Sequence, residues 1–324
     1  MNRTRTVKTP TAVGLLLALT LIAGSLGFAQ DKVRTSYSSR SYAFLPAYVA
    51  QASGFFRDEN LDVELIQMRP GISSAALYNG DVFATLTFGS TIAAIVSGFP
   101  LKVVAVLTVK PIHYLVARPE IQTVQDLKGK RLGVSQLLGT DEFAAHAILE
   151  ALGLSPRDLK SIALGDEAIR REALRRGMVD ASAVAPPGPV HLAREGFRIL
   201  GGPKDVKIGS PSAGLTVTEK NLKERPDLVR RLSRALLRGL RLIHDNGDAT
   251  KKIMTQWLNL SPQVAADSYQ LIIASFSLDG EADEMTLKSV IEARRKSGKV
   301  EKEIPLEQIV DFRLIREVRR ELGL

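Results

Sequence analysis

The chain has 324 residues, with 44 Lys and Arg against 35 Asp and Glu, and no cysteine. The absence of cysteine excludes a disulfide framework, thiol catalysis and a lipid anchor on an N-terminal cysteine. The positive charge would suit an anionic ligand, although keeping a protein soluble is the more common role of such a modest excess.

Residues 1–29 have the three-part pattern of a secretory signal peptide. Three basic residues precede an apolar run over 12–23, and small residues follow up to Ala29. The run is short for a membrane span, and an uncleaved anchor is the alternative. We expect cleavage after Ala29, which lowers the net charge from +9 to +6 by removing the three basic residues. The mature chain would then be free in the periplasm and not a lipoprotein.

Short apolar runs alternate with helical patterns through the first two thirds of the mature chain. This alternation is typical of βαβ units and mostly parallel sheets. The predicted strands cover residues 33–37, 61–66, 82–88, 102–107, 114–117, 131–134, 160–163, 181–185, 198–200 and 214–217.

From residue 219 the pattern changes to helices only. Pro226 and Pro262 stand where a first-turn proline is tolerated, and Ser261 is a candidate cap for the helix that follows it. The predicted helices cover residues 227–244, 249–258, 262–276, 283–296 and 311–322.

Four arginines of the predicted helix 227–244 share one face. In a nucleic-acid-binding protein such a stripe would follow the phosphates. No aromatic residue stands among these arginines, so we interpret the stripe as a solvated face and expect no nucleic-acid partner. The four are Arg230, Arg234, Arg238 and Arg241.

Three landmarks recur in the same order, about 97 to 99 residues apart. Residues 33–37 correspond to 130–134, residues 77–84 to 174–181, and residues 97–99 to 195–197. A repeat of this length, built from strand, loop and helix, indicates two similar α/β lobes rather than a short-period solenoid.

The expected architecture is two Rossmann-like α/β lobes with a helical C-terminal portion. Residues 30–115 and 211–324 would form lobe one, and residues 116–210 would form lobe two. Glycine and proline interrupt the pattern near 110–119 and 203–213, where we expect the chain to cross between the lobes. Two crossings would make a hinge.

Ligands of open α/β sheets bind beyond the carboxyl ends of the strands, where loops lead into helix N-termini. The repeat assigns four such segments: 38–45 and 87–90 in lobe one, and 135–141 and 185–188 in lobe two. Their hydroxyls, glycines and backbone N–H groups suit an oxyanion or a small polar molecule. The candidate ligand-binding residues are Ser39, Arg40, Tyr42, Thr87, Gly89, Ser90, Ser135, Gly139, Thr140 and Pro186.

Each candidate also has a structural role that the sequence leaves open. Serine and threonine at these points can cap helices or shape turns, which is more common than a ligand contact. Arg40 could add a formal charge to the site. Tyr42 could cover the apolar part of a ligand or pack under its loop, and Pro186 could stiffen a cleft wall or end a strand.

Catalysis and metal binding find little support in the sequence. No nucleophile elbow, Walker loop or dinucleotide fingerprint occurs. Asp141, at a predicted helix start, resembles a cap more than a general base. We therefore expect no cofactor, no metal and no reaction. The histidines lack a second metal ligand at helical or turn spacing, and they are His113, His146, His191 and His244.

Residues 47–56, 79–84 and 124–134 carry a family resemblance. Together with the signal peptide they resemble the solute-binding proteins of ATP-driven (ABC) importers, in the branch that serves aliphatic sulfonates, taurine, nitrate and thiamine-pyrimidine precursors. The resemblance implies a type II Venus-flytrap fold. Its lobes close on the ligand, and the closed form docks on an inner-membrane permease with its cytoplasmic ATPase. It also implies a ligand held by the loops around Ser39–Tyr42, Thr87–Ser90, Ser135–Thr140 and Pro186.

We therefore interpret the chain as a monomeric periplasmic protein that binds a small polar or anionic solute. An enzyme on the same scaffold is one alternative. Fungal thiamine-pyrimidine synthases and desulfinases of this kind use cysteine, which this chain lacks, and the menaquinone-pathway enzymes act in the cytoplasm. A ligand sensor that signals to a membrane kinase is the other alternative.

Overall fold

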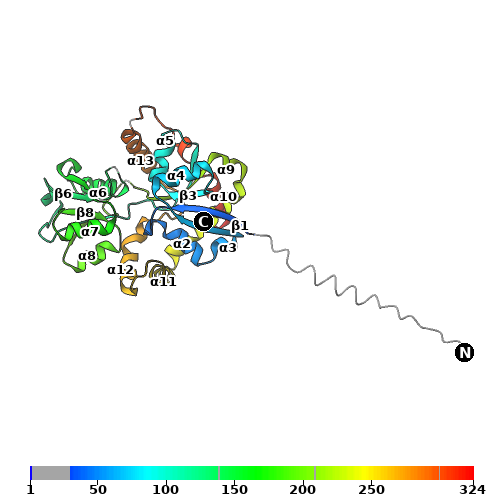
Figure 1. The fold of residues 1–324 in the computed structure, drawn as a ribbon, viewed down its shortest axis with the longest axis horizontal. Helices are drawn as coiled ribbons and strands as arrows, with labels where there is room; N and C mark the ends of the chain where they lie inside the picture. Colours follow the sequence, from blue (N-terminus) through cyan, green and yellow to red (C-terminus); the bar gives the residue numbers. More distant parts are fainter. Residues whose placement is uncertain (2–29, 138, 208, 299) are drawn as a thin grey trace.

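A computed structural model describes residue 1 and residues 30–137, 139–207, 209–298 and 300–324. Apart from Met1, the predicted signal peptide lies outside this part of the chain. Figure 1 shows two α/β bodies side by side, with residues in green forming the body opposite the N-terminal strands. No helix among the described residues is long and apolar enough to cross a membrane.

Lobe one is built on a five-stranded sheet in the order β2-β1-β3-β10-β4. β1 is parallel to β2 and β3, whereas β10 is antiparallel to β3 and β4. Every residue of β3 is buried, as expected for a central strand covered on both faces. The strands are β1 (Asp31–Tyr37), β2 (Leu61–Gln67), β3 (Ala84–Thr87), β4 (Leu101–Val106) and β10 (Ala213–Thr218).

Lobe two repeats this plan in a sheet of order β7-β6-β8-β5-β9. β6 is parallel to β7 and β8, whereas β5 is antiparallel to β8 and β9. The strands are β5 (Tyr114–Ala117), β6 (Arg131–Val134), β7 (Lys160–Ala163), β8 (Ala181–Val184) and β9 (Arg198–Gly201).

The chain crosses between the two sheets twice, so that lobe two is built from the consecutive strands β5 to β9 and lobe one takes back β10. β5 follows β4 along the chain but joins the sheet of lobe two, and β10 follows β9 but joins the sheet of lobe one. The crossing segments are therefore residues 107–113 and 202–212. The lobe limits at 115/116 and 210/211 stay predictions.

Helices flank both sheets, and the C-terminal third of the chain adds to lobe one. Helix α10 packs against α2 and α15, α13 packs against α5, and α12 reaches α8 of lobe two. The longer helices are α2 (Leu45–Ala52), α4 (Pro70–Asn79), α5 (Gly89–Val96), α6 (Thr140–Ala151), α7 (Glu167–Arg175), α8 (Gly188–Arg194), α10 (Pro226–Asp245), α11 (Gly247–Leu258), α12 (Pro262–Ile272), α13 (Glu284–Ser297) and α15 (Arg313–Glu321). The short ones are α3 (Phe55–Asp58), α9 (Glu219–Glu224) and α14 (Leu306–Ile309), with single 3₁₀ turns at Tyr42–Phe44, Val124–Leu127, Pro156–Asp158 and Ile273–Ser275.

The start of α12 confirms its predicted cap, because the Val264 N–H donates to Ser261 Oγ at 3.3 Å. Its end differs from the prediction. The α-helix stops at Ile272, and one 3₁₀ turn carries the chain to Phe276, whose backbone is extended. The Ser275 hydroxyl donates to the Pro111 carbonyl oxygen at 2.9 Å, so this turn is tied to the first crossing segment.

The arginine stripe of α10 is not the solvated face that the sequence indicates. Its four side chains are 23–42% exposed and form ion pairs. The partners lie on or beside α3 and α15, or one turn along α10, so the helix pattern alone did not reveal most of them. The pairs are Arg230–Glu317 at 2.6 Å, Arg234–Glu59 at 2.7 Å, Arg238–Asp58 at 2.7 Å and Arg241–Asp245 at 3.1 Å.

Candidate ligand-binding cleft

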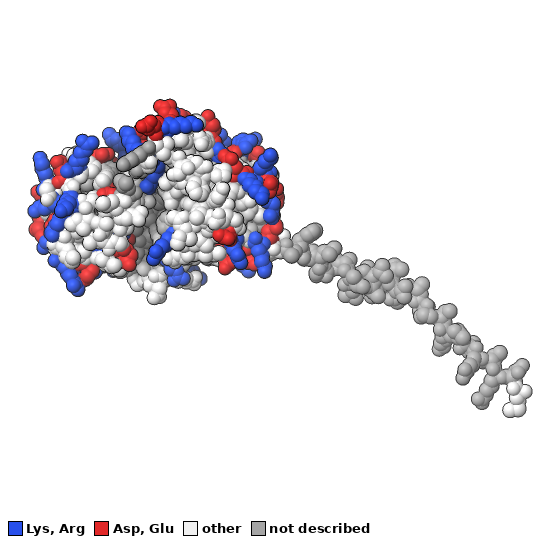
Figure 2. All heavy atoms as spheres, turned by 45° about the horizontal axis from the view of Figure 1, so that its top comes forward, with Lys and Arg blue, Asp and Glu red and all other residues white. Residues whose placement is uncertain are grey.

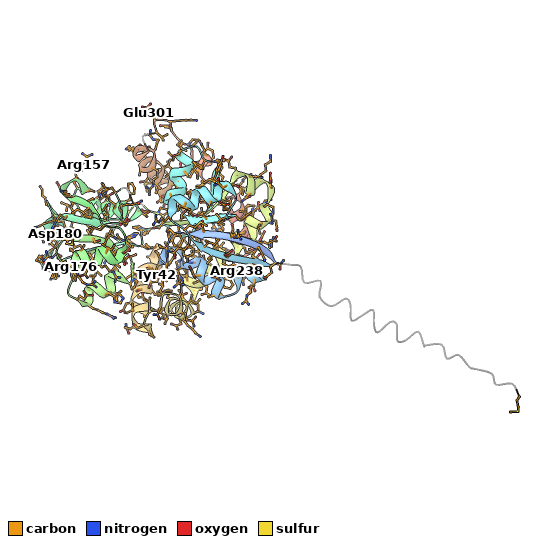
Figure 3. The ribbon with its side chains drawn as sticks, viewed as in Figure 1. Tyr42, Arg157, Arg176, Asp180, Arg238 and Glu301 are labelled. Atoms are coloured by element: carbon orange, nitrogen blue, oxygen red, sulfur yellow. The ribbon has the colours of Figure 1, made fainter. Side chains whose placement is uncertain are left out.

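The four predicted loop segments follow the carboxyl ends of β1, β3, β6 and β8. Figure 2 shows a hollow between the two lobes, whereas charged side chains are spread over the outer surfaces of both. Figure 3 shows Tyr42 between the lobes, with Asp180 on the outer side of lobe two and Arg238 on lobe one.

Thr87 and Ser90 belong to a chain of hydroxyls at the end of β3. Ser36 Oγ lies 2.5 Å from Ser73 Oγ, which lies 2.8 Å from Thr85 Oγ1. Thr85 Oγ1 lies 3.0 Å from Thr87 Oγ1, to which the Ser90 hydroxyl donates at 3.2 Å. Ser90 is half-buried and the other four are buried. A ligand would therefore contact this row of hydroxyls at Ser90.

Both hydrogen-bond donors of Ser135 bind the carboxylate of Asp141. Its N–H donates to Asp141 Oδ2 and its hydroxyl to Asp141 Oδ1, both at 2.6 Å. Asp141 is buried and also accepts from Arg170 Nη1, so it is more than the simple cap that the sequence indicates. Gly139 fits the same packing, because a Cβ there would lie 2.9 Å from Asp141 Oδ1. These two predicted residues shape the start of α6 around the carboxylate.

The side chain of Tyr42 is fully buried, and its hydroxyl has no hydrogen-bond partner among the described residues. Burial raises the pKa of Tyr42 to about 12, the neighbouring Ser268 hydroxyl acts in the opposite direction, and the charge of Glu167 adds to the rise. The hydroxyl of Ser268, on α12, is likewise buried without a partner in the described chain. Tyr42 and Ser268 therefore lie next to each other with unused hydrogen-bonding capacity.

His113 lies in the first crossing segment, close to the ion pair of lobe two. Its Nδ1 is buried and has no partner among the residues described. Burial lowers the pKa of His113 to about 4; the charge of Asp141 opposes this shift and that of Arg170 adds to it. Burial likewise raises the pKa of Glu167, whose carboxylate accepts from the Ala185 N–H at 3.1 Å. The sequence predicted that His113 is an isolated structural histidine. The spacing of residues along the chain does not show that the first crossing segment brings it close to Asp141 and Arg170.

Ser39, Arg40 and Pro186 lie at the edges of this region. Ser39 and Arg40 are exposed, and the Arg40 charge opposes the rise in the pKa of Tyr48 to about 12 that burial causes. Arg40 thus lies near the stack of Tyr48 on Trp257, whose ring centroids are 3.9 Å apart. Pro186 is buried two residues before the start of α8 and is joined to Pro187 by a cis peptide bond.

Gly89 of lobe one lies against both the guanidinium of Arg294 and the hydroxyl of Thr140 of lobe two. A Cβ on Gly89 would lie 2.8 Å from Arg294 Nη2 and 3.4 Å from Thr140 Oγ1. Arg294 comes from α13, and its guanidinium carbon lies 4.7 Å from the centre of the Phe143 ring on α6. The starts of α5 and α6 are thus brought together around one cation.

This junction opens into a cavity of about 590 Å³ between α6, α13 and the second crossing segment. The volume is in the range of small-molecule sites. Of the ten predicted binding residues, Gly89 and Thr140 are among its described lining residues and the other eight are not. The remaining lining includes Phe143, His146, Ala147, Glu150, Ala151, Val206, Lys207, Gly209, Ser210, Pro211, Ser289, Val290, Ala293 and Arg294.

Sequence reasoning missed Arg294, Phe143 and His113. Phe143 and His146 recur at helical spacing on the face of α6 that begins at Thr140, so that face could have been proposed from the sequence. Arg294 stands in a run of three basic residues near the end of a polar helix, and nothing local separates it from Arg295 and Lys296. Arg294 lines the cavity because of the way α13 packs against α5, which the sequence does not show.

Relatives of this chain include named binding proteins. The riboflavin-binding protein RibY of Chloroflexus aurantiacus is 28% identical over 66% of this chain and 63% of its own length, which is less than two thirds of that protein. The putative binding protein YtlA of Bacillus subtilis is 24% identical over 90% of both chains. An enzyme is similar over a shorter stretch: the 4-amino-5-hydroxymethyl-2-methylpyrimidine phosphate synthase of Candida albicans is 31% identical over 37% of this chain.

The fold is that of periplasmic binding proteins. The periplasmic aliphatic sulphonate binding protein SsuA of Escherichia coli superimposes with a TM-score of 0.71 at 17% identity, over 86% of this chain and 91% of that one. The two mixed sheets, flanking helices and helical C-terminal portion agree with the predicted two-lobed α/β fold. The family model described as NMT1/THI5-like matches residues 41–250, well over half of the chain, and the protein therefore belongs to the NMT1/THI5-like family.

Proposed function

We propose that this protein is the periplasmic solute-binding component of an ABC importer. It binds a small polar or anionic solute between its lobes and delivers it to an inner-membrane permease. In this proposal residues 1–29 are a cleaved signal peptide, residues 30–115 and 211–324 form lobe one, and residues 116–210 form lobe two. No reaction is performed on the solute, and the protein acts as a monomer.

One observation carries this proposal: Gly89 of lobe one and Thr140 of lobe two lie next to each other in the wall of one cavity of about 590 Å³. A solute there contacts both lobes only when they are together. Its binding energy therefore favours the closed form, which is the state that a permease can recognise. The binding-protein fold and the relatives named as binding proteins support the same reading.

The predicted site residues divide into two groups in this proposal. Gly89 and Thr140 contact the solute, because they line the cavity, and Ser90, Tyr42 and Pro186 support the walls of the cleft. Thr87, Ser135 and Gly139 hold the loops in place through internal hydrogen bonds and packing. Ser39 and Arg40 lie at the entrance.

A thermal-shift screen of the purified chain tests the proposal. The panel contains sulfonates, taurine, nitrate, pyrimidines, riboflavin, carboxylates and amino acids. A solute at about 100 times its dissociation constant adds roughly 2.7 kcal/mol of stability if it binds the folded state alone. A shift, with the solute recovered unchanged by mass spectrometry, is the expected result. Conversion of the solute identifies an enzyme instead, and a flat response across the panel contradicts the proposed cargo classes.

The transport partner needs a separate measurement. The liganded chain should stimulate ATP hydrolysis by an ABC importer reconstituted in vesicles, and the ligand-free chain should stimulate it less. Phosphorylation of a membrane kinase in response to the liganded chain, without stimulation of any importer, would assign the protein to signalling.

A further inference from the structure

We propose that α12 and α13 form a two-sided clasp that holds the lobes together and favours the closed form of the protein. On one side of the cleft the clasp is the ion pair Arg194–Asp267, and on the other it is the contact of Arg294 with the Phe143 ring. Figure 1 shows these sides as α12 beside α8 at the bottom and α13 beside α6 at the top. The inference rests on the proposed function, in which the lobes move against each other, and it names residues that set the balance between open and closed forms.

Helix α12 is fixed to lobe one and to the first crossing segment. The Tyr269 hydroxyl donates to the Ile243 carbonyl oxygen of α10 at 2.7 Å. In the 3₁₀ turn after the helix, the Ser275 hydroxyl donates to the Pro111 carbonyl oxygen at 2.9 Å. The helix therefore moves with lobe one, and its end is held at the hinge.

The same helix also contacts lobe two. The Tyr114 hydroxyl of β5 donates to the Leu271 carbonyl oxygen at 2.7 Å, and the Leu271 side chain packs against the core of lobe two. One helical turn further from the hinge, Arg194 Nη2 of α8 donates to Asp267 Oδ2 at 2.8 Å. Rotation about the crossing segments displaces a point more when it lies further from them. Opening the lobes would therefore separate Arg194 from Asp267 before it disturbs Tyr114, which directly follows the first crossing segment.

Helix α13 repeats this arrangement at the second crossing segment. Near its start, Thr286 Oγ1 accepts from the Gly209 N–H at 3.0 Å, and Ile291 is buried in the core of lobe one. Eight residues after Thr286, or about 12 Å along the helix, Arg294 reaches α6 of lobe two. Its guanidinium carbon lies 4.7 Å from the centre of the Phe143 ring. Each crossing segment thus has a helix of lobe one bound to it, and each of these helices contacts lobe two further out.

Both outer contacts are weak enough to break and re-form as the lobes move. The side chains of Arg194 and Asp267 are 50% and 37% exposed, so water screens their attraction. Loss of such a pair corresponds to about a 1.5- to 5-fold change in the ratio of open to closed forms. A cation–π contact is of similar strength. Because the two contacts share no residue, their factors should multiply, and the clasp biases the lobes without locking them.

Spin labels on the two lobes measure this balance directly. The chain has no cysteine, so two introduced cysteines are the only labelling sites. Arg157→Cys on lobe two and Arg313→Cys on lobe one place the labels at exposed positions. Double electron–electron resonance on the ligand-free labelled chain gives the populations of short and long distances between the lobes. Small-angle X-ray scattering of the unlabelled chain gives the radius of gyration as a second readout.

Two substitutions each remove one side of the clasp. Arg194→Gln and Phe143→Leu should each raise the ratio of open to closed forms about 1.5- to 5-fold. The double variant should raise it about 2- to 25-fold and should increase the radius of gyration. Arg194→Glu should open the lobes further than Arg194→Gln, because it puts two carboxylates opposite each other. Adding Asp267→Arg to Arg194→Glu restores an ion pair of reversed polarity and should return the ratio toward that of the parent.

Two matched controls remove the same kinds of contact within a single lobe. Arg175→Gln breaks an ion pair with Glu195 at 2.7 Å inside lobe two, between side chains that are 35% and 41% exposed. Phe55→Leu removes a ring that lies 4.2 Å from the guanidinium carbon of Arg238 inside lobe one. Both controls should keep the distance distribution of the parent protein.

An unchanged distance distribution in the double variant, or equal opening in the two controls, would overturn the inference. The charge exchange at Arg194 and Asp267 alters only an exposed pair, so it decides the α12 side even if Phe143→Leu does not fold. All these measurements use ligand-free protein. If no solute of the screening panel binds, the proposed cargo is contradicted, whereas the populations of open and closed forms still decide whether the clasp exists.

Discussion

Arg170 and Asp141 form an ion pair that is almost completely shielded from water, with each side chain 5% exposed. Asp141 lies in the first turn of α6 and Arg170 lies on α7. Arg170 Nη1 also donates to the Ala183 carbonyl oxygen on β8 at 2.7 Å. The pair therefore joins both helices to the carboxyl ends of the strands of lobe two, where the Ser135 loop is held.

Removing one partner of this pair leaves the other buried without compensation. Arg170→Met should lower the free energy of unfolding by about 3 to 5 kcal/mol, measured by urea denaturation. Arg176→Ala is the control, because that side chain directly follows α7, is 71% exposed and pairs with Glu172 at the surface. We expect the control to cost less than about 1 kcal/mol. Equal losses in both variants would show that burial does not strengthen the Arg170 pair.

Gly139 and Gly71 give opposite results when changed to alanine. A Cβ on Gly139 would lie 2.9 Å from both Asp141 Oδ1 and the Gln136 carbonyl oxygen, so the loop must shift. We expect Gly139→Ala to cost about 1 to 3 kcal/mol of unfolding free energy. Gly71 lies in the first turn of α4 with nothing within 4 Å of a Cβ, and Gly71→Ala should stabilise by up to about 1 kcal/mol. Thermal melts should show a lower melting temperature for Gly139→Ala and a higher one for Gly71→Ala. A lower melting temperature for Gly71→Ala would contradict this prediction.

Tyr42 and Tyr48 differ in whether their hydroxyls form a hydrogen bond within the described structure. The Tyr48 hydroxyl donates to Tyr37 Oη at 2.6 Å, so Tyr48→Phe should cost about 1 kcal/mol of stability. The Tyr42 hydroxyl is buried without a partner in the described structure, so Tyr42→Phe should leave stability unchanged or slightly raised in the ligand-free protein. A loss of stability comparable to that of Tyr48→Phe in ligand-free protein would show that the hydroxyl has a partner.

The fold could be predicted from the sequence because its signals are local. The alternation of apolar runs with helical patterns, and the repeat that matches β1 to β6, are enough for two α/β lobes with loops at the carboxyl strand ends. Short-range chemistry was predictable too, as the Ser261 cap shows. Strand β3 begins two residues later than predicted, at Ala84, because Val82 and Phe83 lie in the turn before it.

The candidate site was less predictable because its partners are distant in the chain. Gly89, Thr140 and Arg294 stand in three separate elements, and their meeting depends on the packing of α13 on α5 and of one lobe on the other. The spacing of residues in the sequence also does not show which hydroxyls already form hydrogen bonds within the protein. Ser135 looks like a free donor in the sequence, but it is bound to Asp141.

His113 should make the stability of the protein fall in mild acid. An unfolded histidine titrates near pH 6.5, whereas burial lowers the pKa of folded His113 to about 4. Between these values the unfolded chain binds more protons, so stability is lost as the pH falls from about 6.5 to about 4. The loss due to this residue is of the order of 2 kcal/mol. The raised pKa of Glu167 acts with the opposite sign, because its contribution is present at low pH and is lost as the pH rises.

The comparison with His113→Gln isolates this contribution from the rest of the titration. Glu167, Asp141, Arg170 and the other histidines remain in the variant, so their effects cancel to first order in the difference between the two proteins. Urea unfolding at pH 7 and pH 4.5 should show a smaller loss of stability in the variant than in the parent protein. Identical losses would mean that His113 is protonated as easily in the folded protein as in the unfolded chain, and that its imidazole is not shielded at the crossing between the lobes.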